Sequence, residues 1–192
     1  MKKIGIYTLL LVGLFSACHE EPYPKPVGYY RIDFPAKEFR EIDSIPFPFT
    51  FQLPQYALVN LNRTKENENF FNIDFPRYKA RIHLSYSKVD GKLNELLENS
   101  RTLVFKHVIK AQDINESLII NESERVFGNY YQIEGNSASG SQFYLTDSTN
   151  HFLRGALYFN VKPNFDSIAP VQEFIKADIE QLIESFKWVE SN

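Results

Sequence analysis

The sequence predicts an α+β fold in which a largely antiparallel sheet is covered by two main helices. Two stretches, about residues 92–110 and 166–186, carry apolar residues at the three- and four-residue spacing of amphipathic helices. Four short stretches before the first helix, and four between the helices, are rich in aromatic and β-branched residues, as strands are. Short connections between successive strands favour antiparallel pairing, and this order of elements is typical of the α+β class.

The first group of predicted strands covers residues 47–53, 56–61, 69–76 and 79–87. In the last of them, apolar and polar residues alternate from Ala80 to Tyr86, which indicates a strand with one buried face. Asp90 and Gly91 then predict a turn into the first helix.

The second group covers residues 117–127, 129–137, 141–147 and 151–161. Gly128 and Asn129 are predicted to form a tight hairpin turn, and residues 147–150 a loop between strands. The final helix has start signals at Asp166 and Pro170. We expect its apolar stripe to pack on the sheet through Phe174, Ile179, Leu182 and Phe186.

The N-terminus has the layout of a bacterial secretory leader. Two lysines precede an apolar run over residues 4–15, which is shorter than the ~20 residues that a membrane-spanning helix needs. Ser16 and Ala17 lead into the only cysteine, Cys18, and the sequence resembles a lipoprotein box. We therefore predict a signal peptide over residues 1–17 and lipidation of Cys18, since two or more acyl chains anchor a protein stably.

The predicted mature chain has a tether and one domain. Residues 18–46 are proline-rich and predict an extended tether over residues 20–26, followed by a segment docked on the domain surface. Residues 47–192 predict a single α+β domain. The formal charge is −3 and there is no basic cluster, so we expect no nucleic-acid partner and membrane contact through the lipid alone.

No sequence motif indicates catalysis, a metal or a cofactor. The four histidines lie far apart and form no metal-binding pair, and Ser137 lacks the second glycine of a nucleophile elbow. Three Asp-Ser tripeptides are similar to the O-glycosylation sequon of Bacteroidota envelope proteins. Their candidate acceptors are Ser44, Ser148 and Ser167. Local capping of turns and helix starts by Asp and Ser is the simpler explanation of the same tripeptides.

The predicted hairpin over residues 141–159 suggests a docking surface. Tyr144, Arg154 and Tyr158 fall on it, and aromatic and Arg side chains are enriched at protein interfaces. One face of this hairpin should pack beneath a helix, while the other face contributes to docking on another envelope protein. The alternative is that these aromatic residues are core or single surface residues.

Several long stretches together resemble the gliding motility lipoprotein GldD family of Bacteroidota. They are the leader, "PKPVGYYRIDFP", "YYQIEGNSASGSQFYLTDS", "HFLRGALYFNVKPNFDSIAPV" and "FIKADIEQLIESFKW". The resemblance implies a non-enzymatic envelope lipoprotein that acts in gliding motility and is linked to type IX secretion, with other envelope proteins as partners. It also implies that Cys18 is lipidated. The order of strands and helices resembles the Mog1/PsbP-like α/β/α sandwich.

Two other functions stay open at this point. A ligand-binding envelope lipoprotein, for a glycan or a lipid, would need a deep pocket lined by aromatic residues. An envelope hydrolase would need clustered carboxylates in contrasting environments.

Overall fold

The computed structural model describes residues 31–61, 68–106, 111–161 and 165–189. The predicted leader, Cys18 and the tether over residues 20–26 lie outside these ranges. The compact unit described below begins at Asp33.

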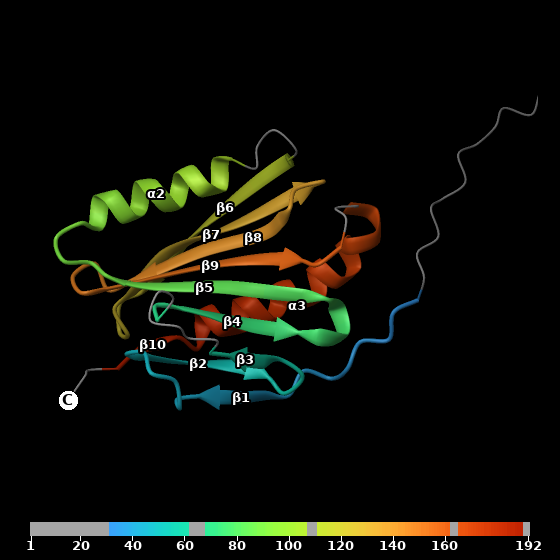
Figure 1. Cartoon of the computed structure of the whole chain (residues 1–192), viewed down its shortest axis with the longest axis horizontal. Helices are drawn as coiled ribbons and strands as arrows, with labels where there is room; N and C mark the ends of the chain where they lie inside the picture. The colour runs from blue at the N-terminus through green and yellow to red at the C-terminus, as the bar shows by residue number, and fades with distance from the viewer. Residues whose placement is uncertain (1–30, 62–67, 107–110, 162–164, 190–192) are drawn as a thin grey trace, which may run out of the picture. The chain divides into compact units, whose positions relative to one another are not determined.

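The larger of two sheets has seven strands in the order β3-β4-β5-β9-β8-β7-β6 (Figure 1). Their bounds, in that order, are Leu58–Asn60, Phe70–Phe75, Ala80–Lys88, His151–Phe159, Ser139–Thr146, Val126–Gly135 and Ala111–Asn121. A smaller sheet consists of β1 (Phe39–Ile42), β2 (Phe49–Pro54) and β10 (Lys187–Trp188). All the strand pairs within the described residues are antiparallel, which confirms the predicted fold class.

The two helices, α2 (Leu93–Phe105) and α3 (Phe165–Glu184), cover opposite faces of the larger sheet. Neighbouring residues of a strand point to opposite faces, and β7 shows which helix each face meets. Tyr130 belongs to the main core, which includes the apolar stripe of α3, whereas Tyr131 packs with Val104 of α2. Figure 1 shows α2 along the β6 and β7 side of the sheet. We call the two sides the α3 face and the α2 face.

The main core lies between the α3 face, α3 and the small sheet. The helix contributes Ile179 and Leu182, and Phe186 follows it; each side chain is at most 1% exposed, as the amphipathic pattern predicted. Phe49 and Phe51 of β2 face them, so the small sheet closes this layer. The hydrophobic cluster beneath α2 is much smaller, with three fully buried residues: Val104, Tyr131 and Ile133.

A short N-terminal segment is fastened to α3 by a buried ion pair. The Lys37 ammonium lies 2.6 Å from Asp178 Oδ1, and it also lies 4.2 Å from the centre of the Phe174 ring. The Tyr56 hydroxyl donates to the same carboxylate at 2.8 Å, and Phe34 stacks on Phe174. The Asp178 side chain has no exposed surface, so a buried charge is paired here as burial requires. We call this group the Lys37 clamp.

The predicted hairpin turn at Gly128 and Asn129 is wrong, because both residues lie inside β7. The chain instead turns over residues 122–125, where Asn121 Oδ1 accepts hydrogen bonds from Ser123 and Glu124. Gly128 instead allows two neighbouring strands to pack closely. A Cβ atom at this position would lie 1.9 Å from the carbonyl oxygen of Tyr144, so only glycine lets β7 and β8 approach so closely.

The structured unit also differs from the sequence prediction at its ends. Strand β1 pairs with β2 and so belongs to the fold, although the predicted domain began at Phe47. Strand β10 after α3 was not predicted. The first helix ends at Phe105, with Lys106 as its C-cap; His107, which was placed on its stripe, lies outside the described residues.

Candidate functional site: the open part of the α2 face

Helix α2 covers only part of its face of the sheet. Its cluster contacts β6, β7 and, through Tyr144, β8. Farther along the sheet, Arg81 and His83 of β5 are exposed on this face. The alternating residues Ile82 and Leu84 point to the other face, and each is 1% exposed. We call the part of the α2 face formed by β9, β5 and β4 the open face.

The three predicted docking residues come together on this side of the sheet. Tyr144 of β8 lies opposite Arg154 of β9, and Tyr158 follows Arg154 by four residues on the same strand. All three side chains are half-buried. Tyr144 stacks on the buried Phe152 with ring centroids 5.4 Å apart and packs against the α2 cluster, so it borders the open face rather than projecting from it.

Arg154 lacks an acidic partner within the described residues. One terminal nitrogen donates to Gln142 Oε1 at 2.5 Å. The Arg154 Nε and the Gln142 Nε2, both buried, have no acceptor among the residues that the structure describes. Burial lowers the pKa of the Arg154 guanidinium, which stays charged at neutral pH. The arrangement therefore leaves a half-buried cation, and a carboxylate could pair with the accessible part of its guanidinium.

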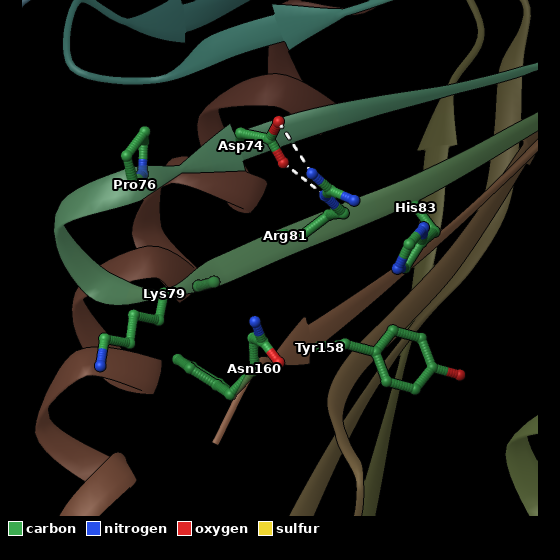
Figure 2. Close-up of a pocket in the computed structure, with 9 residues that line it drawn as sticks. Asp74, Pro76, Lys79, Arg81, His83, Tyr158 and Asn160 are labelled. Atoms are coloured by element: carbon green, nitrogen blue, oxygen red, sulfur yellow. Dashed lines mark hydrogen bonds and ion pairs between the residues drawn. The ribbon is translucent and has the colours of Figure 1, made fainter. Parts of the chain in front are cut away.

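A pocket of about 590 Å³ adjoins Tyr158 on the open face (Figure 2). Its lining residues are Asp74, Pro76, Lys79, Ala80, Arg81, His83, Tyr158, Phe159 and Asn160. They come from β4, β5, the end of β9 and the turns beside them, and the β5–β9 pairing places Arg81 opposite Tyr158. The pocket is open and mixes polar groups with the aromatic residue Tyr158, whereas Phe159 also packs against the main core.

Asp74 and Arg81 form the polar side of this pocket. Asp74 Oδ1 accepts from Arg81 Nε at 2.5 Å, and Oδ2 accepts from Arg81 Nη2 at 3.1 Å (Figure 2). Asn60 donates to the same carboxylate at 3.1 Å. Burial alone would raise the pKa of Asp74, but the hydrogen bonds from Arg81 and Asn60 lower it. A carboxylate held ionised in this way is a poor general acid.

His83 lies beside the ion pair, edge to face with Tyr158 at 5.5 Å between ring centroids. Burial and the neighbouring Arg81 charge lower the pKa of His83, so the ring is neutral at neutral pH. Lys79 adopts a left-handed backbone, with φ of 49°, and its side chain extends away from Arg81 in Figure 2. With Arg154 nearby on β9, the open face has more cations than acids, although the whole chain carries −3.

Apart from Tyr158, the pocket residues were not predicted as part of a site. The alternation in residues 79–87 places Arg81 and His83 on one face, and that signal was available in the sequence. The sequence gives no comparable signal for Asp74 or Asn160, because strand register brings them there. Among the described residues, no group of three or more His, Cys, Asp or Glu side chains lies close enough to hold a metal ion.

The candidate glycosylation serines are all exposed. Ser44 donates to Asp43 at 2.8 Å, and Ser167 lies in the first turn of α3. Ser148 sits in the β8–β9 turn with φ of 67°. There the Asp147 carboxylate accepts three successive backbone N–H groups, so local capping does account for this tripeptide. Glycosylation of these serines and lipidation of Cys18 stay predictions.

Within the described residues, neither helix is long and apolar enough to span a membrane. No curated protein sequence matches the chain. Two similar solved structures are the cyanobacterial PsbP of Synechocystis sp. PCC 6803 and the Ran-binding protein Mog1p of Saccharomyces cerevisiae. PsbP has 8% identity and a TM-score of 0.49 over 92% of this chain and 99% of its own. Mog1p has 9% identity and a TM-score of 0.49 over 81% of this chain and 97% of its own.

The match to a protein family is more specific than these distant structural similarities. The family described as gliding motility lipoprotein GldD matches residues 19–188, which include both sheets, both helices and every residue of the open face. The chain therefore belongs to the gliding motility lipoprotein GldD family.

Proposed function

We propose that this lipoprotein is a non-enzymatic assembly factor that docks on another envelope protein through the open face. In this proposal the acylated Cys18 anchors it to a membrane, the domain faces the periplasm, and the docked partner belongs to the gliding or type IX secretion machinery. The observation that carries the proposal is Arg154, a half-buried guanidinium without an acidic partner among the described residues.

The surroundings of Arg154 support protein docking. Arg and Tyr are the residue types that contribute most at interface centres, and Tyr144 and Tyr158 lie on either side of Arg154. Phe70, on the same side of the sheet, is 54% exposed and adds apolar surface. A partner carboxylate that reached Arg154 would form a charge-assisted, partly buried hydrogen bond.

The geometry of the pocket supports a binding role over a catalytic one. A hydrolase of the kind considered above would use two carboxylates in contrasting environments. Asp74 is the one carboxylate in the pocket lining, and its oxygens are occupied by Arg81 and Asn60. Asp74, Arg81 and Asn60 therefore bond to one another instead of acting on a substrate. This arrangement suits a surface that binds a partner.

The test is charge reversal at Arg154 in cells. Arg154→Glu should abolish motility and crosslinking to the partner, because it places an acid opposite the partner's acid and the two charges repel. Arg154→Lys keeps the charge but loses the planar fork, so it should retain part of both. Arg101→Glu, on the exposed side of α2, is the matched control and should change neither. Normal motility with folded, lipidated Arg154→Glu protein would refute docking through this face.

A second candidate function, glycan binding, is favoured by the pocket itself. Its volume of about 590 Å³ suits a small ligand, and Tyr158 with Asp74, Arg81 and Asn160 offers an aromatic ring and hydrogen-bonding groups. Titration of envelope polysaccharide fragments, followed by NMR, would detect it. Loss of binding in Tyr158→Ala without loss of motility would separate this function from docking.

A further inference from the structure

Strand β6 forms one outer edge of the seven-stranded sheet. It runs for eleven residues, Ala111–Asn121, whereas β3 at the opposite edge has three. Strand β7 pairs with one side of β6, and no strand within the described residues pairs with the other side. A long edge with unpaired N–H and C=O groups is a template for another strand.

Proteins commonly protect such edges with charges, proline or bulges, and β6 has these devices only in its first half. The pairing with β7 is shifted between Ala111 and Asp113, and acidic residues follow at Asp113 and Glu116. The remaining residues, 117–121, contain neither a charge nor a proline. Leu118 and Ile120 there are 71% and 61% exposed and point to the same face of the sheet.

We propose that the outer edge of β6, over residues 116–121, accepts an extended segment of another envelope protein as an additional strand. Main-chain hydrogen bonds would supply affinity, and side chains at alternate positions would supply specificity. The incoming strand carries apolar residues beside Leu118 and Ile120 and a Lys or Arg opposite Glu116. This contact is independent of the open face, because β7 and β8 lie between β6 and β9.

Charge distinguishes such a partner from a second copy of this chain. Residues 111–124 contain four acids, Asp113, Glu116, Glu122 and Glu124, and no Lys or Arg. Pairing of two identical β6 edges would bring these acids together without a compensating cation. A strand with cations opposite Glu116 would instead be attracted by these acidic side chains.

The test uses the full lipoprotein in detergent and a nine-residue peptide of alternating Lys and Val. Hydrogen exchange should slow at those amides of residues 116–121 that point away from β7 when the peptide is added, because the alternate amides already bond β7. A peptide with prolines at its two central valines should give no protection, since proline removes ladder donors. A Glu–Val peptide should bind more weakly than the Lys–Val peptide.

Two variants make the result specific to this edge. Glu116→Lys should reverse the preference between the Lys–Val and Glu–Val peptides, with each affinity changing about two- to five-fold, as a cross-strand charge pair would. Leu118→Lys should weaken Lys–Val binding, and a thermal melt of each variant checks folding. Protection outside β6, or an unchanged preference in folded Glu116→Lys protein, would overturn the proposal. Concentration-dependent protection of β6 without peptide would identify a second copy as the occupant and overturn the proposed partner chemistry.

Discussion

The Lys37 clamp gives the sharpest stability prediction. Lys37→Met keeps most of the side-chain volume but removes the ammonium that pairs with Asp178, whose side chain is fully buried. Breaking a buried pair from one side costs about 3–5 kcal/mol. Tyr56 still donates to the carboxylate, and Lys37 itself is 27% exposed, so we expect a loss of about 2–4 kcal/mol at pH 7.

The loss should depend on pH with a definite sign. Burial raises the pKa of Asp178 above its ordinary value of 3.8, although Lys37 and Tyr56 oppose this shift. A raised pKa means that the stability due to this group is fully present below the unfolded value and is lost as the pH rises through the folded value. Lys37→Met raises the folded pKa further. The difference in free energy of unfolding between wild type and the Lys37→Met variant should therefore be largest at pH 7 and become smaller toward pH 4.

Urea melts at pH 4, 5 and 7 test this reasoning. In Asp178→Asn protein, the further change Lys37→Met should have a much smaller effect, because no buried charge is left unpaired. Lys176→Met is the matched control, since Lys176 is also 27% exposed but pairs with a solvent-exposed Glu173, and it should cost less than about 1 kcal/mol. A Lys37→Met deficit below 1 kcal/mol, or one equal at all three pH values, would refute the account of the clamp.

Three further predictions concern packing and processing. Gly128→Ala should destabilise the fold by at least about 1–3 kcal/mol in a urea melt, because its Cβ would meet the Tyr144 carbonyl; a neutral effect would mean that β7 and β8 can separate. Ile179→Ala should cost about 2–5 kcal/mol in the same assay, since Ile179 is 1% exposed in the main core, and a loss below 1 kcal/mol would contradict that packing. Mass spectrometry of the mature protein should find an acylated N-terminal Cys18, and an intact Met1 would exclude lipidation there.

Local patterns in the sequence predicted most of the elements, because each pattern reports which side of a segment is buried. The alternation around Ile82 and Leu84 identified β5, and the stripe through Ile179 and Leu182 identified α3. The turn at Gly128 was predicted wrongly for a physical reason. A glycine permits either a turn or a close approach between strands, and only the neighbouring β8 decides between them.

The candidate site was less accessible to sequence reasoning. Tyr144 and Arg154 could be paired in advance because a short predicted loop joins their strands. The pocket lies where β5 pairs with β9, which brings Arg81 opposite Tyr158 although they are far apart in the sequence. No local sequence pattern specifies that strand register. That Arg154 has no acidic partner among the described residues is likewise a property of the packed sheet, since the chain has 24 acidic residues and only the fold determines which of them come near.

The position of the Lys37 clamp in the chain has a mechanical consequence. Any pull transmitted from a lipid anchor near the N-terminus enters the compact unit through Asp33 and reaches Lys37 before the first strand, β1. The Arg77–Asp33 hydrogen bond, the Phe34–Phe174 stack and the Lys37–Asp178 ion pair therefore take the force before β1 does, and the last two pass it to the middle of α3. The β1–β2 hydrogen bonds, which could otherwise separate one after another, are shielded from that force until the clamp gives way.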